Sequence, residues 1–444
     1  MSSATLARRV ALGIIRVMRS KDAYVNPLIE ARLREGRLSA EERAFVTRLA
    51  RGVAATFGEL DIILIKNNKR SKLPEPRLRD ILRLATYEMA FLRKEPAIVI
   101  DQAVELTKSL LPYATGVTNA LLRAVAEDLK EFPWGDPSTD VTALAHQQAF
   151  PLWLARRLIN DLGHEAAVAF MEASNLPAPV YLADLHDLTT LRIESADLST
   201  YRSQRESGAF IVADASAQDV ARLALPPRSG PFLEIGSGRG TKTVLLQRAA
   251  QRAYGSQTSH YAVEIHAYKH ELLRERIARY ALTDVTPVTA DALALDESIG
   301  REGFPSVFSG ALIDAPCSNT GTLRRHPEAR WRLTPEAISQ MAGRGAAMLT
   351  ALAPHIAPGG FVVYATCSVL KEENEQVIAA FLDSLEGAAF SCCPPGQGAA
   401  SSCCPPGQGA AFSCCPPGQE FFRSMLTPGS PDAHFAAKLV RSKG

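Results

Sequence analysis

The run PFLEIGSGRGTKT at residues 231–243 decides the fold of the second half of the chain. Residues 232–235 are typical of a buried strand, alternating glycines fill the turn at 236–240, and a helical pattern then continues to about Gln251. A second strand pattern follows at residues 261–265. Strand, glycine turn, helix and strand in this order predict a parallel sheet with helices on both faces.

Further strand patterns continue this alternation at residues 286–289, 309–313 and 360–365. Strand-like segments at 420–426 and 434–440 close the chain. We therefore expect a doubly wound α/β domain over residues 213–444. Folds of this kind bind ligands beside the carboxyl ends of their strands, so the residues that follow each strand are the candidates for a site.

The glycine turn excludes two common nucleotide-binding motifs. Thr241 separates Gly240 from Lys242, which a P-loop does not allow, and the third glycine comes one residue too early for the dinucleotide fingerprint. The pattern acid-x-Gly-x-Gly-x-Gly from Glu234 resembles the S-adenosylmethionine loop of Rossmann-like methyltransferases. The resemblance implies that the cofactor is bound by the loop residues Gly236, Ser237, Gly238, Arg239, Gly240, Thr241 and Lys242.

Acidic residues close four successive predicted strands, at Glu234, Glu264, Asp291 and Asp314. An exposed acid after a strand is commonly a cap or turn residue, so each one alone indicates little. Together they are expected to point into one crevice at the same edge of the sheet. There Glu264 is expected to accept hydrogen bonds from ribose hydroxyls and Asp291 to lie near an adenine, so that both, with Asp314, join the expected cofactor site.

Two thiols stand at strand ends outside a cysteine-rich repeat. Cys317 follows Asp314, and Cys367 follows the strand pattern at 360–365. A single free cysteine is usually a small buried hydrophobic residue. Two Cys-Ser pairs at neighbouring strand ends indicate instead a site for nucleophilic chemistry, since a nearby helix start can lower the pKa of a thiol.

The runs DAPCSNTGT at 314–322, RHPE at 325–328, YATCS at 364–368 and EENE at 372–375 resemble the paired-cysteine motifs of the Sun/RsmB RNA cytosine-5 methyltransferases. The resemblance implies that Cys367 adds to carbon 6 of the cytosine, that Asp314 hydrogen-bonds its N3 and amine, and that Cys317 assists release. The family's cofactor loop reads Cys-Ala-Ala-Pro-Gly-Gly-Lys-Thr. This chain keeps from it only the later glycine, the lysine and the threonine.

The front of the chain is helical and basic. Helical spacing recurs without strand patterns at residues 5–20, 40–56, 59–66, 76–91, 98–111 and 116–129. The runs LRLATYE at 82–88 and VTNALLR at 117–123 resemble the NusB-type RNA-binding fold. A basic loop holds Lys66, Lys69, Arg70 and Lys72; such a loop is usually only a solvated surface, but the basic bias of the whole segment favours RNA contact.

These patterns divide the chain into an all-α NusB-like domain at 1–131, a small α+β connecting module at 141–212 and the α/β Rossmann-like class I methyltransferase domain at 213–444. Residues 132–140, rich in Pro, Gly and Asp, are expected to form a linker. The connecting module is short and lacks the family's Arg-Val-Asn signature near Val180. Residues 387–419 repeat an 11-residue unit with Cys-Cys-Pro-Pro, which we expect to be an insertion without regular helix or strand and without metal binding.

Length and charge indicate where the protein is located and which part of it is basic. The 444 residues include no apolar run of transmembrane length and no signal-peptide pattern at the start, so we expect a cytoplasmic monomer without a membrane partner. Residues 1–100 hold 20 Lys plus Arg against 11 Asp plus Glu, a net +9, which leaves −7 of the total +2 for residues 101–444. The front end is thus the basic pole.

The expected activity is S-adenosylmethionine-dependent methylation of carbon 5 of a cytosine in RNA, with small-subunit (16S) rRNA as the expected partner. A second hypothesis keeps the chemistry and replaces the substrate with tRNA or another RNA. A third is a non-catalytic NusB-like RNA-binding or ribosome assembly factor, against which the intact pair of Cys317 and Cys367 argues.

Overall fold

The computed structural model describes residues 3–34, 38–69, 72–299, 303–393 and 421–443. It divides into two compact units, and each unit is built from two separate stretches of the sequence. The first unit comprises the chain up to Pro177 together with Leu323–Leu333, and the second comprises Ala178–Thr322 and the chain from Thr334 onward. The eleven-residue segment from Leu323 to Leu333, which immediately follows a predicted catalytic motif, therefore folds with the front of the chain.

The first unit is built from helices, as predicted. They are α1 (Ser3–Lys21), α2 (Val25–Leu33), α3 (Ala40–Ala55), α4 (Phe57–Asn67), α5 (Pro76–Ala90), α6 (Pro96–Leu110), α7 (Thr115–Asp128), α8 (Val141–Gln148), α9 (Leu152–Leu162) and α10 (His164–Ser174), with the 3₁₀ turns η1 (Pro112–Ala114) and η5 (Pro327–Trp331). The sequence analysis missed α2. Pro27 looks like a helix breaker, but it lies in the first turn of α2, where a missing backbone N–H costs nothing.

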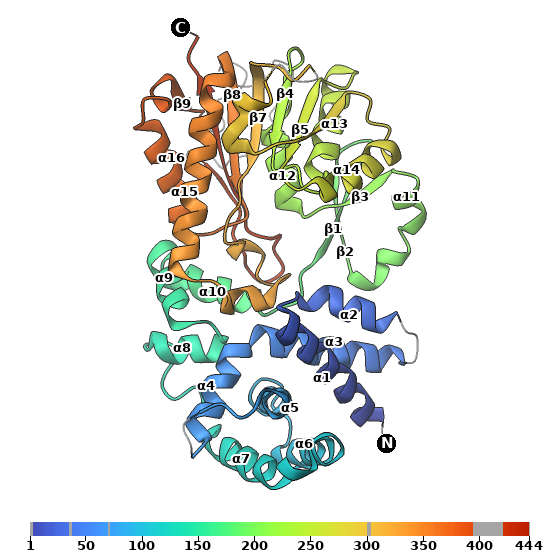
Figure 1. The fold of residues 1–444 in the computed structure, drawn as a ribbon, viewed down its shortest axis with the longest axis vertical. Coiled ribbons are helices and arrows are strands. Elements are labelled where there is room, and N and C mark those ends of the chain that lie inside the picture. Colours follow the sequence, from blue (N-terminus) through green and yellow to red (C-terminus); the bar gives the residue numbers. More distant parts are fainter. Residues whose placement is uncertain (1–2, 35–37, 70–71, 300–302, 394–420, 444) are drawn as a thin grey trace. The chain divides into compact units, whose positions relative to one another are not determined.

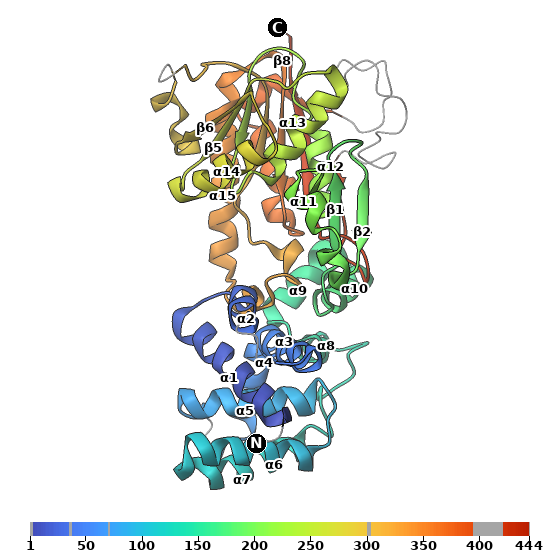
Figure 2. The same ribbon diagram turned by 90° about the vertical axis from the view of Figure 1, so that its right-hand side faces the viewer.

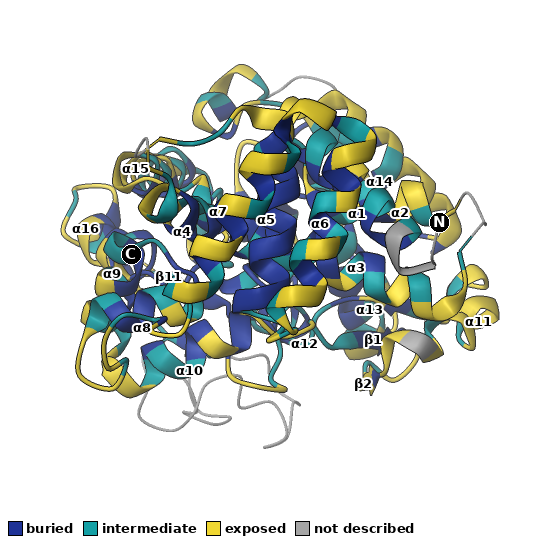
Figure 3. Cartoon of the chain, turned by 90° about the horizontal axis from the view of Figure 1, so that it is seen from below, coloured by how far each residue is buried: buried dark blue, intermediate teal, exposed yellow. Residues whose placement is uncertain are grey.

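Helix α5 forms the centre of the first unit and is buried along most of its length (Figure 3). Its buried charges are all paired. Arg8 binds Glu88 at 2.6 Å, Arg19 binds Asp80 at 2.9 Å, and Arg83 binds Asp61 at 2.6 Å. Since a buried ion that loses its partner is strongly destabilising, these pairs fix the register of α5 against its neighbours.

The segment Leu323–Leu333 is anchored inside this unit. The Trp331 indole Nε1 donates to the carbonyl of Ala55 at 2.7 Å, and the buried Arg330 guanidinium donates to Asn175 Oδ1 at 2.8 Å. The backbone N–H of Val25 donates to Glu328 Oε1 at 3.0 Å. The RHPE motif of the sequence analysis thus belongs structurally to the helical unit.

The predicted linker at 132–140 forms turns between α7 and α8, and its first residues pack on the first unit. Phe132 is buried, and its ring contacts that of Trp134 edge to face. Lys66 of the predicted basic loop lies over the Trp134 ring and pairs with Asp128 at 2.8 Å. Phe132 and Trp134 thus anchor the start of the linker, and Lys66 is paired within the unit. Arg70 of the same loop lies outside the described residues.

The second unit contains a three-stranded antiparallel sheet in the order β2-β1-β3 and a mixed sheet in the order β10-β11-β8-β7-β4-β5-β6, with β9 paired to β11. The strands are β1 (Val180–Asp184), β2 (Thr190–Ile193), β3 (Phe210–Val212), β4 (Phe232–Ile235), β5 (His260–Glu264), β6 (Val285–Thr289), β7 (Phe308–Asp314), β8 (Ile356–Thr366), β9 (Phe390–Cys392), β10 (Phe422–Arg423) and β11 (Phe435–Arg441). The helices are α11 (Arg202–Glu206), α12 (Ala215–Leu223), α13 (Thr241–Tyr254), α14 (Ala267–Arg279), α15 (Pro335–Leu352) and α16 (Glu375–Leu382), with the 3₁₀ turns η2 (Ser195–Ser199), η3 (Ala292–Glu297), η4 (Thr320–Thr322), η6 (Ala353–His355), η7 (Lys371–Glu373) and η8 (Gly387–Ala389).

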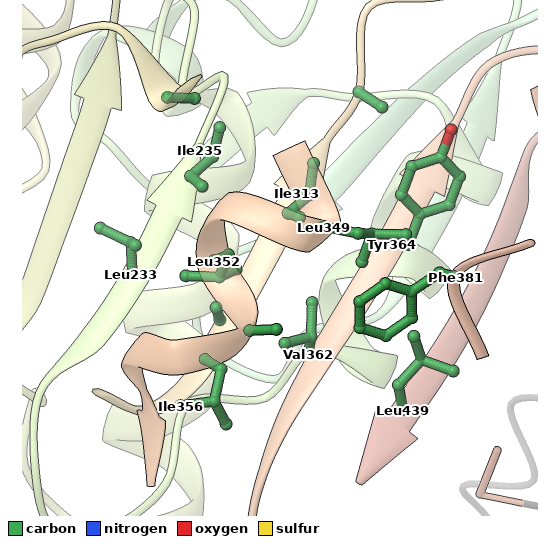
Figure 4. Close-up of a cluster of buried hydrophobic side chains, with 14 of the residues drawn as sticks. Leu233, Ile235, Ile313, Leu349, Leu352, Ile356, Val362, Tyr364, Phe381 and Leu439 are labelled. Atoms are coloured by element: carbon green, nitrogen blue, oxygen red, sulfur yellow. The ribbon is translucent and has the colours of Figure 1, made fainter. Parts of the chain in front are cut away.

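Helices cover both faces of the mixed sheet, which confirms the predicted doubly wound α/β architecture (Figure 1). Alternate residues of each strand face opposite sides. On one face Leu233, Ile313 and Val362 pack against α15 and α16 (Figure 4). On the other, Phe232 and Leu312 pack against α12 and α13. The small antiparallel sheet packs on α12 (Figure 2), so the boundary between the units runs through the predicted connecting module at 141–212.

The start of the repeat corrects one prediction. Residues 390–392 form β9, paired antiparallel with β11, although we expected no regular strand between 387 and 419. The Phe390 ring is buried against Phe381, and this burial holds the strand that comes before the first Pro-Pro pair. The remainder of the repeat, from residue 394, lies outside the described residues. Within the described part of the chain no helix is both long and apolar enough to span a membrane.

Candidate active site

The strand order places the site at the point where the sheet changes direction. From β4 the chain builds outward through β5 to β6, and then returns to build β7 and β8 on the other side of β4. A crevice at such a switch point opens beside the carboxyl ends of the two central strands. Gly236 follows β4 and Asp314 ends β7, and a Cβ atom added to Gly236 would lie only 2.5 Å from the carbonyl oxygen of Asp314. Only glycine fits there.

The glycine turn carries the backbone into α13. Gly236, Gly238 and Gly240 all have positive φ angles, of 80°, 55° and 81°, which side-chain-bearing residues rarely adopt. The turn ends on the N-terminus of α13, where backbone N–H groups are available to a ligand. Ser237 Oγ is buried and has no hydrogen-bond partner among the described residues. The loop thus combines close backbone approach with an unpaired buried hydroxyl.

Glu264, at the end of β5, is held against this loop. Its carboxylate accepts hydrogen bonds from Gly238 N at 3.2 Å and from His266 N at 3.1 Å, and it pairs with Lys269 at 3.2 Å. Asp291, after β6, is exposed and accepts from the backbone of Leu293 at 2.9 Å. Both acids lie at successive strand ends as predicted.

Glu234 does not point into the crevice, in contrast to the sequence analysis. Its carboxylate is buried and accepts from Thr243 Oγ1 at 2.6 Å, and it lies 2.9 Å from His260 Nε2. A carboxylate satisfied by two partners inside the unit contributes to packing of α13 and β5 rather than to the site. Arg239 of the loop is exposed, and Thr241 Oγ1 accepts a hydrogen bond from Arg276.

Lys242 is paired with the predicted catalytic acid. Its Nζ lies 2.7 Å from Asp314 Oδ2. Burial alone lowers the pKa of Lys242, but the ion pair with Asp314 and the nearby Cys367 and Glu234 outweigh it, so that the pKa is raised. Lys242 is therefore cationic at neutral pH and holds the Asp314 carboxylate in place.

A histidine that the sequence analysis missed lies beside this pair. His434, directly before β11, is buried, and its Nδ1 has no hydrogen-bond partner within the described residues. Burial and the charge of Lys242 lower its pKa, so it is neutral at pH 7. No sequence pattern marks it, because the antiparallel β11 brings it to the site from the far end of the chain.

The two predicted thiols are in contact. Cys317 Sγ lies 3.4 Å from Cys367 Sγ, although 50 residues separate them in the sequence. The hydrogen bond to Cys367 and burial raise the pKa of Cys317 well above its usual value, so Cys317 remains a protonated thiol. Two sulfurs this close can reach one small planar substrate.

Asn319 touches both thiol segments and was also missed. Its φ angle is +57°, in the left-handed region that Asn tolerates better than most residues. Its Nδ2 donates to the Cys317 carbonyl at 3.0 Å, and its Oδ1 accepts from Cys367 Sγ at 3.0 Å. Asn319 fixes the spacing of the two cysteines from the Cys317 side.

Glu373, in η7, forms hydrogen bonds with both of these segments. It is buried, and it accepts from Ser318 N at 2.6 Å, from Ser318 Oγ at 2.5 Å and from Ser368 Oγ at 2.5 Å. Ser318 and Ser368 directly follow the two cysteines. Burial raises the pKa of Glu373, while these hydrogen bonds oppose the shift. One carboxylate therefore sets the relative position of both thiols.

Among the residues that the structure describes, no group of three or more His, Cys, Asp or Glu side chains is arranged to hold a metal ion. The groups that converge on the crevice are thus an acid paired with a lysine, two thiols and the glycine turn.

Comparison with known proteins shows the family to which this fold belongs. Residues 223–439 match the family model described as 16S rRNA methyltransferase RsmB/F, and residues 5–127 match the NusB family model. The fold and the site therefore define a Rossmann-like methyltransferase that carries a NusB domain in front.

Related proteins agree over most of the chain. A probable ribosomal RNA small subunit methyltransferase B of Bacillus subtilis is 27% identical over 410 residues, covering 85% of this chain and 88% of the relative. A putative methyltransferase of Mycobacterium tuberculosis is 30% identical over 408 residues, covering 84% and 86%. The chain belongs to the RsmB/F methyltransferase family.

The crystal structure of PH0851 has the same fold. It matches with a TM-score of 0.73 at 20% identity and covers 99% of both chains. At this level of identity, the match supports the fold alone.

Proposed function

We propose that the protein methylates carbon 5 of a cytosine in small-subunit ribosomal RNA, with S-adenosylmethionine as the methyl donor. The observation that carries the proposal is the pair of strand-end thiols, Cys317 and Cys367, 3.4 Å apart, at the same edge of the sheet as the Asp314–Lys242 pair. The relatives named as small-subunit rRNA methyltransferases supply the substrate class.

The residues at the switch point fit S-adenosylmethionine. A Cβ atom at Gly236 would meet the Asp314 carbonyl, so the turn lies directly against the end of β7, and among the described residues Ser237 Oγ is a buried hydroxyl without a hydrogen-bond partner. Glu264 lies where its carboxylate can accept from ribose hydroxyls, and the exposed Asp291 lies at the next strand end. These residues would hold the cofactor, which supplies an electrophilic methyl group.

The thiols supply the activation that the target carbon needs. Carbon 5 of cytosine is a poor nucleophile. When the thiolate of Cys367 adds to carbon 6, the ring becomes an enamine that is nucleophilic at carbon 5. The addition puts negative charge on the ring, which N3 neutralises by taking up a proton; the Asp314 carboxylate, held by Lys242, would then accept hydrogen bonds from N3–H and from the exocyclic amine. After carbon 5 has gained the methyl group it loses its proton, and the bond between carbon 6 and sulfur breaks.

Cys317 is assigned to the release step. Its raised pKa keeps it as a thiol, which leaves the nucleophilic role to its neighbour Cys367. The target base must leave its stack to meet both sulfurs, which costs roughly a few kcal/mol and less in a loop or bulge. An unpaired cytosine in rRNA is therefore the expected target.

The proposal is tested with purified protein, labelled S-adenosylmethionine and small ribosomal subunits from cells that lack the enzyme. We expect one methyl group per subunit, and mapping should place it on carbon 5 of a cytosine. Transfer to tRNA but not to subunits would assign the same chemistry to another RNA. Binding of rRNA without transfer to any RNA would refute the enzymatic proposal.

Replacing Gly236 with Ala should selectively weaken cofactor binding. The Cβ atom would meet the Asp314 carbonyl at 2.5 Å, and the residue would keep a strained φ of +80° at a cost of about 1–2 kcal/mol. Displacement of the turn should lower S-adenosylmethionine affinity about 10- to 100-fold in calorimetry. Gly255→Ala, with φ of +75° and nothing within 4 Å, is the matched control and should bind normally. Equal weakening in both variants would contradict the assignment.

A further inference from the structure

The second unit contains a pocket of about 420 Å³ whose polar lining is dominated by arginine. Its walls are α11, β3 and the last turn of α14, which lie beside one another in Figure 1. The charged residues that line it are Arg202, Arg205, Glu206, Arg276 and Arg279. Four arginines and one glutamate give the pocket a formal charge of +3.

The positive charge of this pocket contrasts with the net negative charge of residues 101–444. Residues 101–444 carry a net charge of −7, so the pocket is a local positive site in an acidic part of the chain. Within the part of the chain that the structure describes, the guanidinium groups of Arg202, Arg205 and Arg279 form no ion pair and no side-chain hydrogen bond. Arginines that a fold keeps together without pairing them to its own acids are available to an external anion.

The pocket is built rather than a chance gathering of surface chains. Gly208 has a φ of +81°, and a Cβ atom there would lie 3.2 Å from the backbone oxygen of Arg279, so the turn before β3 approaches the end of α14 closely. The Tyr201 and Phe210 rings meet edge to face at 5.8 Å and hold α11 against β3. The two pairs of arginines are thereby fixed on opposite walls.

The pocket also adjoins the cofactor turn. Arg276 Nη1 donates to Thr241 Oγ1 at 2.5 Å, and Thr241 is the first residue of α13. Burial, with the positive charges of Arg239 and Arg279 nearby, lowers the pKa of Arg276. Arg276 thus links the pocket to the start of α13, close enough to the exposed Arg239 for the two charges to interact.

We propose that the pocket lined by Arg202, Arg205, Arg276 and Arg279 binds backbone phosphates of the substrate RNA beside the active site. This inference rests on the proposed RNA substrate. It adds an RNA contact in the second unit to the RNA binding expected of the basic NusB domain. Planar guanidinium groups recognise phosphate oxygens in pairs, and phosphate contacts set the position of an RNA without reading its sequence.

The test is the salt dependence of RNA binding to the full-length protein. Each phosphate contact contributes a slope of roughly 0.7–0.9 to the fall of log affinity with log salt. Arg205→Gln with Arg279→Gln removes one arginine from each wall, and should reduce that slope by about 1.5 and affinity about 10- to 30-fold near 0.1 M salt. Arg276 is left unchanged because it contacts Thr241.

Arg274→Gln is the matched control, since Arg274 lies on the same helix but does not line the pocket. We expect its RNA affinity and salt slope to equal those of the wild type. In methyl transfer, the double variant should show a raised KM for RNA with unchanged kcat and unchanged S-adenosylmethionine affinity. A slope unchanged in the double variant, or reduced equally by Arg274→Gln, would overturn the proposal.

Two further results separate this inference from the proposed function. RNA binding is measured without methyl transfer, so a protein that binds rRNA but transfers nothing would refute the activity and leave the pocket tested by its salt slope. Inorganic pyrophosphate is titrated as a second probe. If it binds the wild type but not the double variant, while RNA binding is equal in both, the pocket serves a small anion and the RNA assignment is wrong.

Discussion

Cys367→Ala should abolish methyl transfer, whereas Cys317→Ala should trap the protein on its RNA. Removing the nucleophile prevents activation of carbon 5, so we expect the rate to fall roughly 10⁴-fold or more. In Cys317→Ala the nucleophile remains 3.4 Å from the vacated position, and addition to carbon 6 proceeds while release is slowed. The product is a covalent protein–RNA complex that migrates slowly on a denaturing gel.

The double variant Cys317→Ala with Cys367→Ala should form no such complex, because Cys367 supplies the bond. Cys392→Ala is the control for loss of a thiol, since Cys392 lies on β9, away from the paired cysteines, and the variant should transfer at the wild-type rate. A complex that survives Cys367→Ala would exchange the roles of the two thiols. Wild-type transfer by Cys367→Ala would exclude covalent catalysis.

Local sequence patterns were sufficient to predict the strand, the glycine turn and the helix that form the candidate site. The strand at Phe232–Ile235 and the helix that begins at Thr241 lie where the apolar run and the glycine turn placed them. Asp314 and Lys242 were both named from sequence. Strand ends and glycine turns are properties of a few consecutive residues, and the parallel sheet then brings them to one edge.

Contacts between distant segments could not be predicted in this way. Glu234 has the same local setting as Glu264, yet its carboxylate is taken up by His260 and Thr243 inside the unit. His434 and Asn319 join the site through the packing of β11 and through a left-handed backbone angle, neither of which leaves a sequence signal. Periodicity identifies a buried face but not the partner that a polar side chain finds there.

The division of the chain into units shows the same limit. Leu323–Leu333 lies in sequence between two elements of the α/β unit, β7 and α15, and nothing in its composition assigns it to the helices at the front. Its place is decided by Trp331, which bonds to Ala55, and by Arg330, which bonds to Asn175. The RHPE motif, which follows the predicted catalytic acid in the sequence, therefore belongs to the first unit.

Glu373→Ala should disrupt both the stability of the second unit and the spacing of the thiols. The change leaves three buried donors from Ser318 and Ser368 without their acceptor. At about 1–3 kcal/mol for each unsatisfied group, we expect the free energy of unfolding to fall by about 3–5 kcal/mol. Methyl transfer should fall through kcat, with little change in the KM for RNA, because Glu373 is buried and acts by positioning the two thiols.

Glu373→Gln separates geometry from charge, because the amide keeps the size of the side chain and one acceptor oxygen. Burial raises the pKa of Glu373 above its usual value of 4.5, so its contribution to stability is complete below that pH and declines as the pH rises through the folded-state pKa. The difference in unfolding free energy between the wild type and Glu373→Gln should therefore decrease from about pH 4.5 upward in chemical denaturation.

Glu372→Gln is the matched control for Glu373→Ala. The Glu372 carboxylate accepts a hydrogen bond from the exposed Ser339, so we expect the free energy of unfolding to fall by less than about 1 kcal/mol. If Glu373→Ala keeps wild-type kcat, or Glu372→Gln lowers it equally, the spacing of Cys317 and Cys367 is set by other contacts, of which the Asn319 amide is the next to test.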